Sequence, residues 1–533
     1  MCNLSNTHFL LDFSTMSAIL SADDLNDFIS PGVACIKPVQ DTNTNQEANG
    51  NGEVEIQIDS EGNPLEISKI DGKQTNLSPA QISLADCLAC SGCITSAEEV
   101  LVAQHSHHEL VKALKLQDKI FVASISQQSR ASLATAYNLP VETIDKLLID
   151  LLVNQMGFKY VVGTSLGRKL SLINEAQHVI TNRGKGSNPI LSSICPGWVL
   201  YAEKTHPYVL PMISTVKSAQ QITGCLLKTL TAHDFHVQKS QVYHLSIMPC
   251  FDKKLESARP EIFGDTIPDV DCVLTAKELI ALLEEESYQL VPKVNPPIVN
   301  LPTEDVYSLV APNDWPYVQY SWTNDPGSAS GGYAFNYLRC LQEDMMLKGH
   351  DESGFSMKII RGKNSDVYEM RLSYKEDKVA SAAIVNGFRN IQNLVRKLKP
   401  NGKATGRVNP LAARRRTRIK NSESTPVEET ADPSKVDYVE IMACPSGCIN
   451  GGGQINPPKD VSEKDWIDEV LKKYNTVPTF DLSLHPKEVQ ALIEWNKIFE
   501  QEHDVNQDRI YKTYFNEVEK PTDPTAILVG SKW

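Results

Sequence analysis

The sequence predicts an α/β protein of two lobes, with parallel or mixed sheets flanked by helices that close around a buried site. A chain of 533 residues is longer than one ordinary core accommodates. From about residue 119 to 285, short β-rich runs alternate with helical stretches, which is typical of a parallel sheet covered by helices. Strand-like and helix-like patterns resume at about 330–400 and again from 436 onward, which indicates a second lobe.

We expect three regions along the chain: an N-terminal region over 1–115, a first α/β lobe over 116–290 and a second over 291–533. In the first region, "VEIQIDSEGNPLEISKI" alternates with a period of two on both sides of "SEGN", which predicts a small hairpin. The second lobe contains a segment near 400–436 that is basic, then acidic, and poor in apolar residues, so we predict a flexible surface insertion. Its "RRRTRIK" could be a nuclear localisation signal, although a solvated loop is favoured.

Charge and hydropathy exclude several classes of protein. The chain has 52 basic and 66 acidic residues, a net charge of −14, which argues against nucleic-acid and anionic-membrane partners. No apolar run is long enough to span a bilayer, and the first residues lack the pattern of a secretory signal. The 12 cysteines are clustered, which in a reducing compartment favours metal ligands over disulfides. We therefore expect a cytoplasmic protein, with a nuclear location also open.

The first cysteine set lies in "DCLACSGC", where Cys87, Cys90 and Cys93 have C-x2-C-x2-C spacing. Two intervening residues let the backbone curl around a compact cluster and present successive sulfurs. A four-iron cluster needs a fourth thiolate, and Cys35 is the nearest upstream candidate. Zinc is the main competitor, but three thiols within seven residues favour iron–sulfur chemistry over the separated pairs of zinc motifs.

The second cysteine set is scattered along the chain, in Cys195, Cys250, Cys444 and Cys448. Each segment begins with a predicted strand and has its cysteine near the end of that strand. Because ligands collect at the carboxyl ends of parallel strands, we predict that these thiols converge, whereas singly each could be a buried apolar cysteine. The glycines at 451–453 allow unusual φ values and let backbone amides approach cluster sulfides.

Together these segments resemble the iron-only hydrogenases, and more closely the NARF family of cytosolic iron–sulfur protein assembly factors. The motifs are "DCLACSGC", "CPGW", "MPCFDKKLE" and "EIMACPSGCINGGGQ", and the resemblance extends from Cys35 to the C-terminus. It implies an iron-only-hydrogenase-like fold and two [4Fe-4S] clusters. One would be held by Cys35, Cys87, Cys90 and Cys93, and the other, between the lobes, by Cys195, Cys250, Cys444 and Cys448.

One departure from the hydrogenase pattern bears on activity. Hydrogenases have a proton-carrying cysteine immediately before the one in "CPGW", and here that residue is Ile194, which cannot relay a proton. Lys253 and Glu256 match a lysine that holds a diatomic ligand and a glutamate that passes protons, but they could equally form a structural ion pair. The resemblance therefore implies a protein that is not an enzyme and that passes clusters from the cytosolic scaffold NTPases to the targeting complex that serves apo-proteins.

Two other functions stay open: a hydrogenase-like oxidoreductase or electron-transfer protein, and a structural zinc-binding interaction protein. At the C-terminus, Trp533 resembles a recognition tag for the β-propeller protein of the targeting complex, although Lys532 stands where such tags often have an acidic residue. The "HSHH" run at 105–108 could bind a metal, but a solvent-facing position is favoured.

Overall fold

The computed structural model describes residues 54–58, 64–68, 74–76, 105–186, 188–294, 296–400 and 429–518. The chain divides into two compact units, Met1–Gly92 and Cys93–Trp533. The first contains an antiparallel sheet in the order β1-β2-β3, and the pairing of its first two strands confirms the predicted hairpin. The strands are β1 (Val54–Ile58), β2 (Pro64–Ser68) and β3 (Gln74–Asn76).

Several predictions fall outside the described residues. They concern the first cysteine set (Cys35, Cys87, Cys90 and Cys93), most of the 400–436 insertion with its basic run, and the terminal Trp533. These remain predictions.

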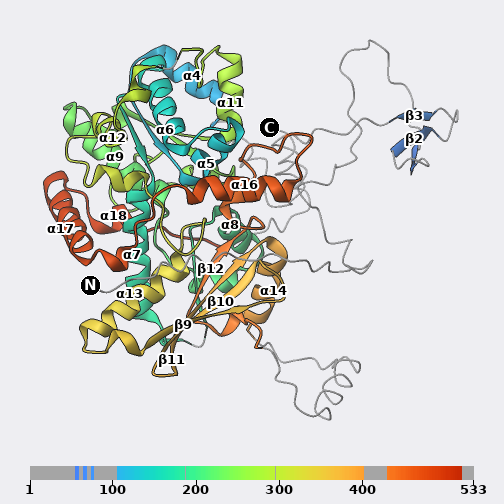
Figure 1. Ribbon diagram of the computed structural model, residues 1–533, viewed down its shortest axis with the longest axis vertical. Coiled ribbons are helices and arrows are strands. Elements are labelled where there is room, and N and C mark those ends of the chain that lie inside the picture. Colours follow the sequence, from blue (N-terminus) through green and yellow to red (C-terminus); the bar gives the residue numbers. More distant parts are fainter. Residues whose placement is uncertain are drawn as a thin grey trace. The chain divides into compact units, whose positions relative to one another are not determined.

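The second unit contains a four-stranded sheet in the order β5-β4-β7-β8, in which every neighbouring pair is parallel (Figure 1). Helices lie between its strands along the chain, so the predicted βα alternation is confirmed. The strands are β4 (Ile120–Ile125), β5 (Tyr160–Gly163), β7 (Val242–Met248) and β8 (Cys272–Thr275). The helices are α5 (Gln127–Ala136), α6 (Val141–Ile149, continued by a π-helix over Asp150–Gln155), α7 (Ser165–Asn182), α9 (Ala219–Asp234) and α11 (Ala276–Glu285).

Alternate side chains of β4 enter different cores because successive residues of a strand point to opposite faces. Phe121, Ala123 and Ile125 join one apolar cluster with residues of α6 and α11. Val122 joins another, which includes residues of α7 and α9. Both faces of this sheet are therefore covered by helices, as expected for parallel strands with near-continuous apolar sequences.

A five-stranded mixed sheet has the order β6-β12-β11-β10-β9. β6, β12 and β11 are parallel, whereas β11, β10 and β9 are antiparallel neighbours. The strands are β6 (Ile190–Leu191), β9 (Phe355–Arg361), β10 (Val367–Tyr374), β11 (Asp377–Asn386) and β12 (Tyr438–Met442). This sheet therefore takes strands from both sides of residue 290, the boundary that the sequence pattern predicts between the two lobes.

Helices α13 (Tyr333–Leu347) and α14 (Phe388–Leu398) pack on this mixed sheet. Its core includes the fully buried Trp198 and Tyr438, which come from distant parts of the chain. Further helices are α4 (His107–Leu116), α8 (Pro196–Thr205), α10 (Asp252–Ser257), α12 (Thr303–Leu309), α16 (Glu463–Asn475), α17 (Pro486–His503) and α18 (Gln507–Tyr511). Within the described ranges, no helix has the length and hydrophobicity that a bilayer crossing requires.

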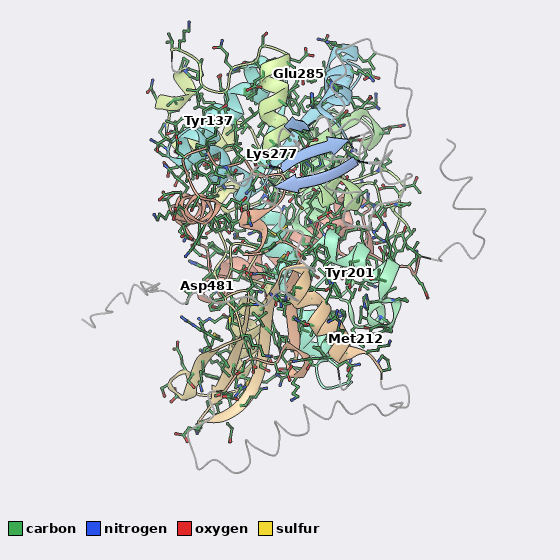
Figure 2. All side chains as sticks on the ribbon, turned by 90° about the vertical axis from the view of Figure 1, so that its right-hand side faces the viewer. Tyr137, Tyr201, Met212, Lys277, Glu285 and Asp481 are labelled. Atoms are coloured by element: carbon green, nitrogen blue, oxygen red, sulfur yellow. The ribbon has the colours of Figure 1, made fainter. Side chains whose placement is uncertain are left out.

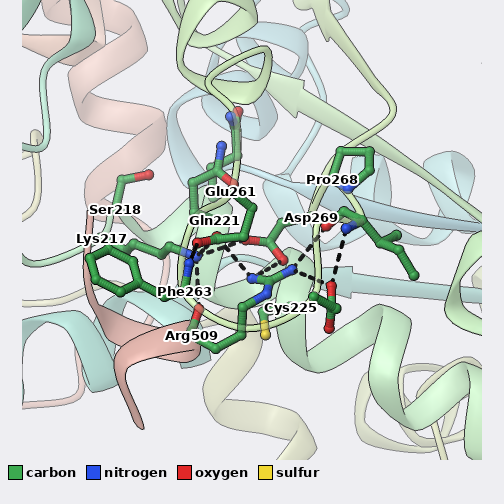
Figure 3. Close-up of polar contacts among 12 residues, drawn as sticks. Lys217, Ser218, Gln221, Cys225, Glu261, Phe263, Pro268, Asp269 and Arg509 are labelled. Atoms are coloured by element: carbon green, nitrogen blue, oxygen red, sulfur yellow. Dashed lines mark hydrogen bonds and ion pairs between the residues drawn. The ribbon is translucent and has the colours of Figure 1, made fainter. Parts of the chain in front are cut away.

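A buried ion network fixes the last described helix (Figure 3). Arg509 of α18 lies 2.7 Å from Asp269 and 3.1 Å from Glu261. Lys217 contacts the same two carboxylates and also donates to the backbone carbonyl of Arg509 at 2.8 Å. These four side chains are at most 9% exposed. Two cations thus share two anions, which holds α18 on the loop that precedes β8.

Candidate metal centre

The described cysteines of the second set lie just past the carboxyl ends of strands from both sheets. Cys195 follows β6 and is the N-cap residue of α8, with Pro196 in the first turn. Cys250 lies between the end of β7 and the start of α10. Cys444 follows β12, and Cys448 begins a short 3-10 turn that ends at Asn450. The site is therefore built where the ends of the two sheets meet.

Direct contacts show that these segments converge. The Cys195 sulfur accepts a hydrogen bond from the Ala443 amide at 3.2 Å, which joins the first segment to the third. A Cβ placed on Gly451 would lie only 2.3 Å from the Pro249 carbonyl oxygen, so the third segment also packs tightly against the backbone beside Cys250. The predicted convergence of the three segments is thus present, while the role of the four thiols as ligands stays a prediction.

The electrostatics of the four thiols fit a site for bound cations. Burial, and then the neighbouring Cys448, raise the pKa of Cys195 to about 12. Burial also raises the pKa of Cys250 and of Cys444 well above the ordinary thiol value, and charges on the other cysteines add to the effect. Four thiolates would repel one another here, so they need protons or metal ions to compensate their charge. Four cysteines match the donor set of a four-iron cluster and also that of structural zinc.

Hydrogen-bond donors surround the sulfurs, as in iron–sulfur proteins, where such bonds tune the reduction potential. The Gly452 amide lowers the pKa of Cys444, against the larger effect of burial, by donating to its sulfur. The Ser330 hydroxyl likewise lowers the pKa of Cys448, against the larger effect of burial, by a hydrogen bond to its sulfur. The Ser330 oxygen also accepts a hydrogen bond from the Cys448 amide at 2.9 Å. The site therefore supplies polar contacts for negatively charged sulfur.

The reason for the three glycines differs in part from the one expected. None of the three glycines has a positive φ, so the freedom of glycine to adopt unusual φ values is not used here. Close packing accounts for two of them: a Cβ on Gly451 would meet Pro249, and one on Gly453 would lie 2.3 Å from Thr275 Cγ2. Gly452 has room, with Phe251 3.9 Å away, and its amide is the one that approaches a sulfur.

Lys253 and Glu256 form an ion pair beside the site. The lysine Nζ lies 3.0 and 2.9 Å from the two carboxylate oxygens and donates to the Ile194 carbonyl at 3.1 Å. These three contacts use the three donors of an ammonium group. The Ile194 side chain is buried in the core of the mixed sheet. The geometry therefore matches the structural interpretation of this pair.

Sequence reasoning missed three residues of the site. Asp252 lies beside the cysteines, and burial raises its pKa to about 6. Its place inside the motif "MPCFDKKLE" was the only signal available. Met442 places its sulfur 3.5 Å from the Cys448 sulfur, and Ser330 contacts Cys448 from a loop far away in the sequence. Met442 also lies inside a quoted motif, "EIMACPSGCINGGGQ", whereas no local pattern marks Ser330.

The solvent-facing position expected for the "HSHH" run is wrong for its first residue. His105 is only 6% exposed, and its ring contacts Ser257 at 3.3 Å and the Val273 amide at 3.2 Å. The side chains of His107 and His108 are 14% and 65% exposed. The run therefore turns from the core to the surface within one helical turn.

Comparisons with known proteins place the chain in a family. A family model described as "Iron only hydrogenase large subunit, C-terminal domain" matches residues 119–452. A protein of Scheffersomyces stipitis named "Cytosolic Fe-S cluster assembly factor NAR1" is 64% identical over 97% of this chain and 100% of its own length. The protein of the same name from Saccharomyces cerevisiae is 39% identical over 86% of this chain and 90% of its own.

Solved structures agree in fold. An [FeFe]-hydrogenase HydA1 from Chlamydomonas reinhardtii, in a variant form, has a TM-score of 0.53 and 20% identity, over 77% of this chain and 99% of its own. The apo form of the same hydrogenase, in another variant, has a TM-score of 0.52 and 18% identity over the same shares. The chain therefore has the fold of the iron-only hydrogenases, and it belongs to the NAR1 family of cytosolic Fe-S cluster assembly factors.

Proposed function

We propose that this protein is a non-enzymatic component of cytosolic Fe-S protein assembly that binds two [4Fe-4S] clusters. Cys195, Cys250, Cys444 and Cys448 would hold one cluster. The observation that supports it is the convergence of the three segments that contain them, with sulfurs that receive amide and hydroxyl hydrogen bonds. Cys35, Cys87, Cys90 and Cys93 would hold the other, which rests on their spacing in the sequence.

The second part of the proposal concerns transfer. The protein would receive or pass clusters between the scaffold NTPases and the targeting complex that serves apo-proteins, and Trp533 would contact the β-propeller protein of that complex. The name shared by the relatives supports an assembly role, and the cytosolic location in that name supports a cytoplasmic site of action. A nuclear location would follow if the basic run "RRRTRIK" acts as a signal.

The non-enzymatic part of the proposal rests on the residues beside the site. Ile194 would stand where a hydrogenase needs a proton carrier, and its aliphatic side chain cannot accept or donate a proton. Lys253 uses its donors on Glu256 and on the Ile194 carbonyl. Hydrogenase activity is the alternative that the fold keeps open, and hydrogen evolution from a reduced dye would support that alternative.

Iron and acid-labile sulfide measured after anaerobic purification test the cluster assignment. We expect about eight iron and eight sulfide per chain, four of each for every cubane cluster. Cys444→Ala should lose about half of both, and Cys87→Ala the other half. Cys225→Ala is the control, because Cys225 is a buried free thiol that lies outside both sets, so the iron and sulfide content of this variant should not change. Zinc without sulfide would reject the assignment in favour of a zinc-binding protein.

A further inference from the structure

Two imidazoles and one carboxylate face one another at the surface, on helices that are distant in sequence. His107 and His108 lie in the first turn of α4, and Glu285 is the last residue of α11. The two helices pack together (Figure 1). Figure 2 shows Glu285 at the end of α11 opposite to the end that bears Lys277. One nitrogen of each ring and one glutamate oxygen lie within 4.8 Å of one another.

The separations of the glutamate oxygen from the two imidazole nitrogens are close to those in a metal site. Glu285 Oε2 lies 2.9 Å from His107 Nε2 and 3.7 Å from His108 Nδ1. Ligands about 2.0–2.1 Å from a tetrahedral Zn²⁺ are separated by about 3.3 Å, a value between these two distances. The 3.7 Å separation is too long for a hydrogen bond, and the His108 ring also lies against the His107 ring, with 4.1 Å between their centroids.

The backbone that bears the two histidines is held by buried contacts. His105 is anchored by its ring, and its carbonyl accepts from Lys254 Nζ at 2.6 Å. Ser106 caps α4 by accepting from the Glu109 amide. A site whose ligands project from such a fixed support loses less freedom when it binds an ion. The acidic residues 284–286, at the carboxyl end of α11, add negative potential that favours a cation.

We propose that His107, His108 and Glu285 form a solvent-open site for a divalent transition-metal ion, with Zn²⁺ the ion that the donor set fits. Two imidazole nitrogens and one carboxylate oxygen leave a fourth position for water. A bound ion would tie the start of α4 to the end of α11. The site is separate from the cysteine centre and does not depend on the proposed function.

A second group in the described part of the chain, His233, Asp234 and Asp314, provides an internal comparison. Glu285 bonds to His107, a member of its own group, whereas the Asp234 carboxylate is held by groups outside its set: it accepts from Tyr160 at 2.7 Å and from the amide and side chain of Asn313 at 3.1 and 3.3 Å. Binding a metal at that group would break these bonds. We therefore expect it to bind Zn²⁺ more weakly, which makes His233→Ala a matched control.

Calorimetric titration of Zn²⁺ into the full-length protein, purified with its clusters and stripped of loose metal by dialysis against chelator, tests the proposal. We expect one equivalent to bind, with affinity reduced by at least about tenfold in His107→Ala and in Glu285→Gln. Glu285→Gln keeps the size of the side chain and removes its charge, which guards against a folding defect in the first variant. His233→Ala should bind as the parent does.

Cobalt serves as a second probe that separates this site from the cysteine centre. Co²⁺ should give d–d bands without the thiolate charge-transfer absorption that cysteine ligation produces, and iron and sulfide content should be equal in all variants. Equal Zn²⁺ binding by Glu285→Gln and the parent, loss of binding in His233→Ala, or a thiolate band with Co²⁺ would each overturn the proposal. Absence of Zn²⁺ binding by the parent would also overturn it, leaving a histidine–glutamate ion pair.

Discussion

Replacement of Gly451 by alanine tests how the loop that bears Cys448 is held against the segment that bears Cys250. A Cβ at this position would lie 2.3 Å from the carbonyl oxygen of Pro249 and 2.9 Å from its carbonyl carbon. Carbon–oxygen contacts of this kind normally lie at about 3.3–3.6 Å, so the two backbones would have to separate by about 1 Å. Neither contact atom belongs to a flexible side chain, so the strain cannot be relieved by a rotamer change.

The strain of this substitution would act on both of the segments that bear cysteines of the candidate metal centre. Overpacking of this kind destabilises a protein by about 1–3 kcal/mol. Because Pro249 precedes Cys250 and Gly451 lies three residues after Cys448, the displacement would also move two predicted ligands apart. We therefore expect Gly451→Ala to lose the cluster of the second cysteine set, about four iron and four sulfide per chain.

Gly452→Ala is the matched control. Among the residues that the structure describes, the atom nearest to a Cβ there belongs to Phe251, at 3.9 Å, so the same change of residue type adds no clash. Iron, sulfide and thermal unfolding of the anaerobically purified variants are the measurements. If Gly451→Ala holds as much iron and unfolds at the same temperature as Gly452→Ala, the tight packing of the two segments is not what the site requires.

Three further predictions concern a buried acid, the ion network and the C-terminus. Burial raises the pKa of Glu175 to about 7, so the folded state holds the carboxyl proton more tightly than the unfolded state does. The contribution of this group to the stability of the folded state therefore falls as pH rises from about 4.5 through 7. Glu175→Gln should therefore gain stability relative to the parent between pH 5 and pH 8 in denaturant unfolding; a constant difference would contradict the assigned shift. Arg509→Met leaves Asp269 without its closest cation, so it should lower the free energy of unfolding by about 3–5 kcal/mol and bring earlier proteolysis near α18. Lys512→Met removes an exposed ion pair with Asp508 and should change the free energy of unfolding by less than about 1 kcal/mol. Deletion of Trp533 should weaken capture of the β-propeller partner in a pull-down and leave iron content unchanged; undiminished capture would exclude the proposed tag.

The sequence allowed the convergence of the cysteine-bearing segments to be predicted, because it follows in part from a local rule. Cys250 and Cys444 each follow an apolar run that forms a strand, and ligands collect at the carboxyl ends of parallel strands. That rule does not predict that the two strands belong to different sheets. The presence of β6 in the mixed sheet follows from no such rule, since a strand of two residues gives too short a sequence pattern to identify the strand with which it pairs. It pairs with β12, which comes nearly 250 residues later in the chain.

Contacts that depend on packing across the chain could not be predicted. Ser330 reaches Cys448 from a loop that has no distinctive pattern, and His105 is buried because Lys254 and Ser257 are brought to it by α10. The glycines show the same limit. Their sequence indicates that side chains are excluded, but whether backbone conformation or a neighbouring backbone excludes them becomes visible only when Pro249 and Thr275 are in place.

The interleaving of the two sheets has a consequence for biosynthesis. β6 and the thiol of Cys195 are synthesised well before β12, yet β12 is the strand that pairs with β6 in the described part of the mixed sheet. The last of the four sulfurs, at Cys448, follows after most of the polypeptide has been translated. A nascent chain therefore lacks Cys444 and Cys448 for most of its synthesis. Any metal that all four cysteines share must then be delivered to a finished or nearly finished protein.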